Sequence, residues 1–582
     1  MKALFVLAAA VVFLPLVHAA EAGRKQSWLT PSVGQTEEGL NELEEPRVLP
    51  PVATKDIRSP VANATGRVHL ERIVVEGNSV LDAADVEAIT GLYVGRALSD
   101  ADLHALREAL SNLYVQAGYL NSGVVIPDQD VSDGTLRLQA VEGGISSVRI
   151  TGDPGFRGGY LEARVMARVS EPLNVYQLRD AMRLLQRDAN VSGIDAHIAP
   201  GAARGSSDLS MNVTAAPPLS VFLSADNHRS EAIGAEQLNV GLAHSNLTGR
   251  GDRLYAEIGF SEGAETGSAG YRLPILANDT TLQVYYQRDQ VDVIERPFED
   301  LDISTQTDTY GLAVTVPLRD TLTNTVSVTL GGEVKRSVTE LSGVRFSLSP
   351  GALNGESKVS ALVLGADWVR RSAAQVLALR GTFRHGLDVL DATEAAPTAF
   401  DPSGTDAEFT TFLGQAQYLR RLTDSVQVAL RATLQLADDP LLGIEKLSMG
   451  GVNTVRGYRE NLLVRDNGWA TSAELHWQPF HTDERAWLQT LTLVPFLDYG
   501  RSWDEEDVDL TSIARDTSDA AYVASAGLGL RWQPLRGLNL ALYWAEDVAD
   551  GFDSGDDPRS GKGSHGLQDD GVHFSVSYVR RF

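Results

Sequence analysis

Much of the sequence alternates strictly between apolar and polar residues. Residues 426–436 are a clear example, with Val, Leu and Ala at the even positions and Gln, Ala, Arg and Thr at the odd ones. Successive side chains of a β-strand point to opposite faces, so this run has one apolar and one more polar face. About 16 such runs follow one another, an even number that suits a single-chain barrel. We therefore predict an all-β transmembrane barrel of about 16 antiparallel strands over residues 217–582, with lipid outside and a wet lumen inside.

The connections between these runs differ in length in a regular way. Short ones include residues 371–374 and 421–424, whereas long ones include residues 386–406, 438–467 and 548–570. Short periplasmic turns and long outer loops are the usual asymmetry of membrane barrels. An even number of strands returns both barrel ends to the periplasmic side, so any soluble domain that precedes the barrel lies there too.

Two small units of similar order precede the barrel. In residues 67–142 we expect a strand over 68–77, a short helix capped by Asp82, and a longer helix opened by Ser99 with Asp102 three residues later. Strands over 123–126 and 136–141 complete a β-α-α-β-β order. Residues 143–216 repeat this order, with Asn174 as a helix cap. Each unit is predicted to form a sheet covered by two helices.

The N-terminal segment has a different character. Residues 1–19 contain Lys2, an apolar run and the small-residue site Val17-His18-Ala19. The run is short for a membrane-spanning helix, which favours a secretory signal peptide over a membrane anchor. Residues 20–66 are rich in proline and polar residues, so we expect a linker with one short helix over 35–45.

Composition narrows the function. The formal net charge is -27, which argues against a nucleic-acid partner. Mean hydropathy is -0.12, too low for a helical membrane protein but suited to a barrel. Cysteine is absent, so disulfides and Cys-ligated zinc are excluded. The sequence has no Gly-x-Ser-x-Gly or His-Glu-x-x-His motif. We expect no catalytic residue, no metal and no cofactor.

The candidate site is a pair of motifs. The long loop 438–467 carries Val455-Arg456-Gly457-Tyr458, and a later strand carries Phe496, Asp498 and Gly500. On that strand Leu493, Leu497 and Tyr499 share one face, so Phe496 and Asp498 are predicted to point inward. Arginine is always charged, and its planar group suits bidentate pairing with a carboxylate.

We therefore expect Arg456 to pair with Asp498 inside the lumen and to act as a conformational latch for the loop. Glu474 is predicted to point inward as well, so it either competes for Arg456 or shares it.

These features resemble the two-partner secretion transporters, the haemolysin/haemagglutinin secretion-activation type within the POTRA-plus-barrel polypeptide transporters. The two β-α-α-β-β units resemble POTRA domains, and the paired motifs have the family's spacing. The last strand ends in Phe582, which resembles the signal by which outer-membrane barrels are recognised for insertion. In this family an N-terminal helix can plug the pore, so residues 20–66 either plug the barrel or form a plain linker.

The resemblance implies a protein-transport function in the bacterial outer membrane, with the two soluble units in the periplasm. The partners it implies are a secreted exoprotein with an N-terminal secretion domain, outer-membrane lipids and the barrel-assembly machinery; we expect a monomer. A barrel-assembly factor of the same superfamily is the alternative, although two soluble units argue mildly against it. A porin-like channel is less favoured because it has no use for two peptide-binding modules.

Overall fold

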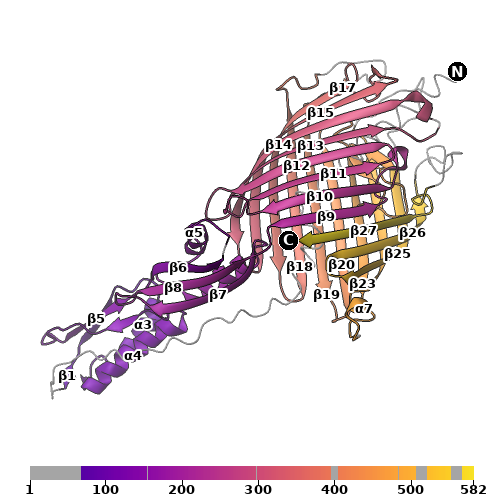
Figure 1. The fold of residues 1–582 in the computed structure, drawn as a ribbon. Helices are drawn as coiled ribbons and strands as arrows, with labels where there is room; N and C mark the ends of the chain where they lie inside the picture. The colour runs from indigo at the N-terminus through magenta and orange to yellow at the C-terminus, as the bar shows by residue number, and fades with distance from the viewer. Residues whose placement is uncertain are drawn as a thin grey trace. The chain divides into compact units, whose positions relative to one another are not determined.

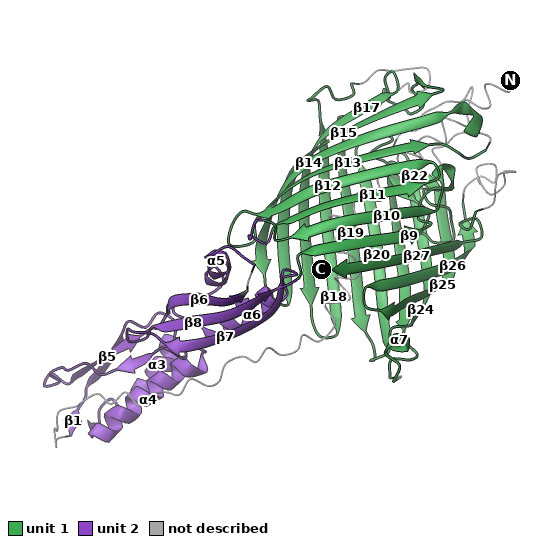
Figure 2. Cartoon of the chain, in the orientation of Figure 1, with its two compact units in different colours: residues 1–42, 217–247, 252–582 green, residues 43–216, 248–251 purple. Residues whose placement is uncertain are grey.

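The computed structural model describes residues 67–153, 155–296, 298–394, 404–482, 484–505, 521–551 and 566–582. The signal peptide, the linker and the plug helix expected over residues 1–66 lie outside the described residues. The chain divides into two compact units, drawn in two colours in Figure 2. Of the described residues, those in 217–247 and from 252 onward form one unit, and those in 67–216 with 248–251 form the other.

The smaller unit begins with an α+β domain. Its sheet has the order β2-β5-β4, with β2 (Arg72–Glu76) parallel to β5 (Thr135–Val141) and β4 (Gly123–Val125) antiparallel to β5. The helices are α3 (Ala83–Thr90), capped by Asp82, and α4 (Asp100–Gln116), which has the predicted capping box. Both helices therefore start where the cap residues predicted.

One prediction for this domain is wrong. The strand predicted over residues 68–77 is divided into β1 (Val68–His69) and β2, and β1 pairs with β3 (Ala97–Leu98) instead. Leu70 lies between them with no exposed surface. Its amide bonds to the carbonyl of Arg96, whereas the next two amides bond to Gly134. Burying Leu70 in the core turns the chain between two sheets.

The core of this domain is closed by leucines of the sheet and of α4. Leu106, Leu110 and Leu138 are each at most 1% exposed, and Tyr114 is fully buried beside them. The Tyr114 hydroxyl donates to Glu142 at 3.1 Å. Burial raises the pKa of Tyr114 well above its ordinary value, and the Glu142 carboxylate raises it further.

A second α+β domain follows with the same order. Its sheet is β6-β8-β7, with β6 (Ile145–Asp153) parallel to β8 (Ser207–Ala215) and β7 (Val191–Pro200) antiparallel to β8. The helices are α5 (Tyr160–Met166) and α6 (Val175–Gln186), and Asn174 caps α6. Apolar residues of both helices and of β8 form a separate core.

The larger unit is a closed antiparallel barrel (Figure 1). The described part of the chain supplies sixteen long strands, which confirms the predicted fold class. Their bounds are β9 Leu219–Asp226, β10 Gln237–Ser245, β11 Arg253–Ser261, β12 Ala264–Pro274, β13 Thr281–Asp292, β14 Ile303–Asp320, β15 Asn324–Leu341, β17 Glu356–Arg371, β18 Gln375–Leu387, β19 Thr410–Arg421, β20 Val426–Ala437, β23 Asn467–Trp477, β24 Thr492–Trp503, β25 Ala521–Leu535, β26 Leu538–Asp550 and β27 Val572–Arg581.

Short elements complete the barrel. The two-residue β16 (Val344–Arg345) pairs with the end of β15. Two 3-10 turns, η1 (Glu231–Ile233) and η2 (Glu299–Leu301), lie in the β9–β10 and β13–β14 connections, and α7 (Ala486–Gln489) lies between β23 and β24. Strands β27 and β9 pair antiparallel and close the barrel. Among the described residues, no helix is both long and apolar enough to cross a membrane.

The alternation of the sequence is the alternation of the two barrel faces. On β24, Leu497 is 63% exposed on the outer face, whereas Phe496 and Asp498 are 4% and 3% exposed. On β23, Trp477 is exposed, and Glu474 is buried. The predicted parity is therefore correct for both strands that carry candidate residues.

The long connection between β20 and β23 has structure of its own. It contains a small hairpin of β21 (Leu447–Met449) and β22 (Leu463–Arg465), which pair with each other apart from the barrel sheet. The sequence analysis did not predict this hairpin. Arg456 lies in the segment that connects the two strands of this hairpin.

The first α+β domain allows a direct test of its core. Leu138→Ala should lower the unfolding free energy of this domain by about 2–5 kcal/mol, because it leaves a cavity in a closed core. Urea unfolding of a fragment spanning residues 67–216 measures it. Leu92→Ala is the matched control, since Leu92 is 64% exposed, and its effect should stay within about 0.5 kcal/mol. Equal effects of the two substitutions would contradict this description of the core.

Candidate functional site in the barrel lumen

The middle of the long loop, around Arg456, is buried within the larger unit, and we call this part the docked end of the loop. Val455, Arg456 and Tyr458 are each at most 1% exposed, and Arg456 is the largest fully buried side chain among the residues that the structure describes. Their surroundings belong to the barrel wall, since Val455 and Tyr458 pack in one cluster with Val523 of β25. A guanidinium group this deeply buried requires specific compensation of its charge.

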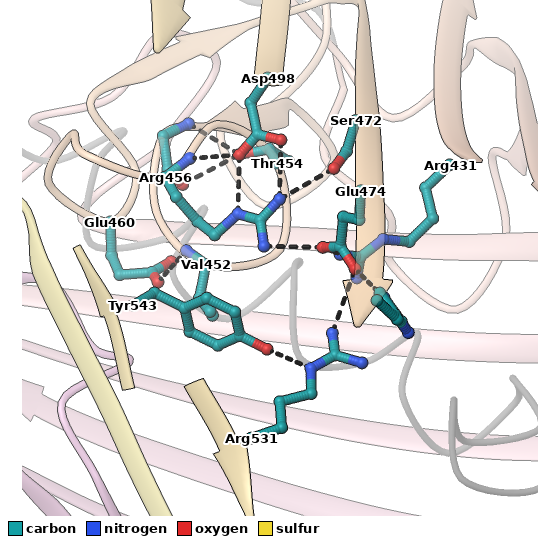
Figure 3. Close-up of polar contacts among 12 residues, drawn as sticks. Arg431, Val452, Thr454, Arg456, Glu460, Ser472, Glu474, Asp498, Arg531 and Tyr543 are labelled. Carbon is teal, nitrogen blue, oxygen red and sulfur yellow. Dashed lines mark hydrogen bonds and ion pairs between the residues drawn. The ribbon is translucent and has the colours of Figure 1, made fainter. Parts of the chain in front are cut away.

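Arg456 forms a fork-like pair with Asp498 of β24 (Figure 3). Its Nε donates to Asp498 Oδ2 at 2.7 Å, and its Nη2 donates to Oδ1 at 2.8 Å. The backbone N–H of Arg456 also donates to Oδ2, at 3.1 Å. Asp498 thus holds both the side chain and the backbone at the end of the loop. Two parallel charge-assisted bonds fix the orientation of both groups.

Glu474 of β23 shares the same guanidinium. Arg456 Nη1 donates to Glu474 Oε1 at 2.7 Å, and Nη2 also donates to the Ser472 hydroxyl at 2.9 Å. The sequence left open whether Glu474 competes with Asp498 or shares Arg456, and the geometry shows sharing. Figure 3 shows both carboxylates converging on this one side chain.

Glu474 has further partners that the sequence analysis did not assign. Arg431 of β20 bonds to Oε1, His476 lies 2.8 Å from Oε2, and Arg531 of β25 lies 3.3 Å from Oε2. Four neighbouring strands therefore meet at this cluster. The only signal for these partners was that Arg431 and His476 have the inward parity of their strands.

Aromatic rings complete the enclosure of the guanidinium. The Arg456 guanidinium carbon lies 3.5 Å from the centre of the Phe496 ring and 5.1 Å from that of Tyr543. A cation above an aromatic face is stabilised by the ring quadrupole, most strongly when water is excluded. Phe496 therefore contacts the same group as Asp498.

The two motif glycines permit close approach of the loop to the wall. Gly457 has φ of +89°, and a Cβ built on it would lie 3.0 Å from Ala545 Cβ. A Cβ built on Gly500 would lie 3.0 Å from Val455 Cγ2. Side chains at these positions would push the loop away from the wall.

Residues just beyond the arginine add further attachments. The Tyr458 hydroxyl donates to the carbonyls of Ala524 and Ala549, at 3.1 Å and 3.2 Å. Arg459 bonds to Glu295 at 2.7 Å and also pairs with Asp569. Tyr458 belongs to the predicted motif, but the role of Arg459 was missed.

The remaining predicted residue is separate from this cluster. Phe582 follows the end of β27 and is 54% exposed, with the Arg580 guanidinium 4.8 Å from its ring. The described residues contain no group of three or more His, Cys, Asp or Glu side chains placed to hold a metal ion.

Comparison with known proteins identifies the family. The model of the haemolysin secretion/activation proteins ShlB/FhaC/HecB matches residues 205–532, which is more than half of the chain. The chain belongs to this family. The model of the ShlB-type POTRA domain matches residues 68–143, so the first α+β domain is a POTRA domain.

Similar proteins align with this chain over most of their own length and of its length. The outer membrane transporter CdiB of Dickeya dadantii is 24% identical over 500 residues, covering 84% of this chain and 85% of that protein. The heme/hemopexin transporter protein HuxB of Haemophilus influenzae is 21% identical over 506 residues, covering 83% and 84%. This chain is therefore a two-partner secretion transporter of the outer membrane, with its POTRA domains in the periplasm.

Solved structures support the same fold. CdiB from Escherichia coli aligns with a TM-score of 0.68 at 20% identity, covering 97% of this chain and 98% of that one. BamA from Haemophilus ducreyi lacking POTRA domains 1–3 aligns with a TM-score of 0.52 at 14% identity, covering 88% of this chain and 100% of that one. These likenesses concern the fold of POTRA domains and barrel.

Proposed function

We propose that loop 438–467 is the gate of the secretion path and that the Arg456 cluster is its latch. The loop is docked inside the lumen at rest, and an unfolded exoprotein passes through the barrel only when the docked end leaves the wall. The observation that carries this proposal is the burial of Arg456, at 1% exposure, against two carboxylates of the wall. No catalytic step is involved.

The energetics favour a positional role over a stabilising one. Removing ions from water costs several kcal/mol per ion, which their mutual attraction only offsets when the geometry is good. Breaking such a pair by deleting one partner costs about 3–5 kcal/mol, because the other charge stays buried and uncompensated. The Arg456 cluster therefore determines where the loop sits and adds little to the stability of the strands.

The gate has two working states. The docked state keeps the lumen closed between rounds of transport, and the undocked state admits the polypeptide. A loop without its latch has no single docked position and fills the lumen irregularly. For this reason, both loss of docking and failure to undock should stop secretion.

Capture of the exoprotein is assigned to the periplasmic domains. In the described chain β7 pairs with β8 alone, so the other edge of this ten-residue strand is open in the sheet. An extended peptide adds to such an edge through main-chain hydrogen bonds. We infer that the N-terminal secretion domain of the exoprotein binds there as an added strand.

Other partners follow from the same assignment. The apolar outer face meets outer-membrane lipids, and the aromatic end at Phe582 serves recognition by the barrel-assembly machinery. The transporter works as a monomer, since one closed barrel provides one path.

Phe582→Ser should reduce the amount of barrel in the outer membrane, because it removes the terminal aromatic residue. Unchanged barrel levels would show that Phe582 does not serve recognition by the barrel-assembly machinery.

The capture proposal predicts binding by the periplasmic fragment. Residues 67–216 should bind the secretion domain of the cognate exoprotein in isothermal titration. Ser192→Pro should weaken that binding, because proline adds a bulky ring and removes an N–H of the edge strand β7, whereas Ser192→Ala, which loses only the hydroxyl bonds to Thr214 and Ala215 of β8, should not. The same fragment with Arg204→Pro is the control, because Arg204 is exposed at the second position of the 203–206 turn, before the left-handed Gly205, where proline is favoured. Binding to unfolded barrel precursors, with none to the exoprotein, would refute capture.

The latch predicts a secretion defect in a folded barrel. Arg456→Ala should reduce secretion at least about tenfold, because Asp498 and Glu474 lose a shared counter-charge. Asp498→Ala should give a similar defect, and the double variant should be no worse than the worse single one. Arg456→Lys should rescue only in part, since an ammonium lacks the planar fork. The measurement is exoprotein in the medium, normalised to heat-modifiable barrel.

Arg501→Ala is the matched control for this series. Arg501 lies on β24 three residues from Asp498, but it is on the exposed outer face. Its loss should leave secretion at the wild-type level. Normal secretion by Arg456→Ala at normal barrel levels would refute the latch. Additive defects in the double variant would show that Arg456 and Asp498 do not act through one shared contact.

A further inference from the structure

The long loop has a second charged attachment, well before Arg456 in the sequence. Glu445 accepts a hydrogen bond from Lys335 Nζ of β15 at 2.6 Å. Lys335 Nζ also lies 3.3 Å from Glu333 of the same strand. The side chains of Lys335 and Glu445 are only 5% and 4% exposed. This contact is therefore buried, although slightly less so than the Arg456 pairs.

Strand β18 contributes a fourth charge to this attachment. Arg384 Nη2 donates to Glu333 Oε1 at 2.8 Å, and Arg384 Nε lies 3.2 Å from Glu445 Oε2. The Tyr285 hydroxyl of β13 donates to the other oxygen of Glu333. Two cations thus face two carboxylates in one buried group. Loss of Glu445 would leave Lys335 and Arg384 beside a single carboxylate.

Apolar packing holds the same part of the loop. Leu441, Leu442 and Ile444 are each at most 1% exposed and lie in one cluster with Val359 of β17 and Phe409, which directly precedes β19. The amide of Leu441 also donates to Asp466 at 3.0 Å, which ties the two ends of the loop together. We call residues 441–446 the base of the loop.

The base and the docked end use different charged groups. Glu445 of the base contacts β15 and β18, and Lys446 contacts Asp504 just past the end of β24, whereas Arg456 contacts Glu474 of β23 and Asp498 of β24. The charged residues described around Glu445 and those around Arg456 have no member in common. Disrupting one set therefore leaves the contacts of the other intact.

Residues with positive φ separate the base from the docked end. Gly450 and Gly451 have φ of +109° and +88°, and Asn461 on the returning side has φ of +62°. Glycine adopts left-handed backbone without a steric penalty, so the chain can turn there. We call residues 452–460, which lie between these positions and include Arg456, the tip of the loop.

We propose that the tip swings about Gly450–Gly451 and Asn461 during secretion while the base stays on the wall, and that Glu445 is the positioning residue that keeps it there. This proposal rests on the gate function of the loop. It specifies that the loop neither leaves the lumen as a whole nor slides along the wall. The exoprotein passes a displaced tip beside a fixed base.

Hydrogen–deuterium exchange of the intact transporter in detergent tests this arrangement. Arg456→Ala should raise exchange at residues 452–460 at least about tenfold and leave residues 441–446 at the wild-type rate. Glu445→Gln should raise exchange at residues 441–446 by a similar factor. Glu265→Gln is the matched control, because Glu265 is an exposed residue of β12 and none of the loop contacts described above involves β12, and it should change neither segment.

Combined variants separate positioning from a general loss of structure. Lys335→Met with Glu445→Gln should expose the base no more than the worse single variant, since both act through one contact. Arg456→Ala with Glu445→Gln should raise exchange both at residues 452–460 and at residues 441–446. Exchange that rises in base and tip together, in either single variant, would overturn the proposal, because the loop would then move as one body.

Secretion measured on the same variants separates this proposal from the gate itself. Glu445→Gln should lower secretion at normal barrel levels. A secretion defect in Arg456→Ala with concerted exchange of the loop would refute only the fixed base. Independent exchange of tip and base with normal secretion in Arg456→Ala would refute the gate and leave the two-part loop standing.

Discussion

A permanent positive charge buried in the barrel lumen is the constraint on which the site depends. Arg456 cannot lose its proton at ordinary pH, so the end of the loop is stable there only beside Asp498 and Glu474. Asp498 depends on this cation in turn, whereas Glu474 also pairs with Arg431 and Arg531. The loop is therefore docked at the point where four barrel strands bring these charges together.

This constraint explains why the surrounding residues have their types. Phe496 and Tyr543 exclude water around the guanidinium and favour its charge through their ring faces. Gly457 and Gly500 let the loop backbone approach the wall closely. Arg431, Arg531 and His476 surround the far side of Glu474. A polar lumen supplies such partners without interrupting the apolar outer face.

The sequence alone predicts much of this arrangement for physical reasons. Alternation with a period of two identifies the strands and assigns Phe496 and Asp498 to the lumen, because one face must meet lipid. Helix caps at Asp82, Ser99 and Asn174 are local, so they locate helix starts without tertiary information. The pair of Arg456 with Asp498 is predictable from the inward parity of Asp498 together with the resemblance of the two motifs to those of the family.

Other features depend on contacts between distant segments and escape sequence reasoning. The break at Leu70 arises from burial in a core that forms only after folding. The β21–β22 hairpin and the partners of Glu445 depend on which strands lie across the lumen. Arg531 reaches Glu474 through the register of β23, β24 and β25, and no local pattern gives this register.

The central claim is that the loop must leave its docked position for secretion to occur. The chain has no cysteine, so Val455→Cys with Val523→Cys, which replace two residues of one buried cluster, introduces a single thiol pair for a reversible disulfide tether between the loop and β25. Secretion should stop when the pair is oxidised and resume on reduction, while each single cysteine variant secretes under both conditions. Undiminished secretion by a fully cross-linked barrel would contradict the account.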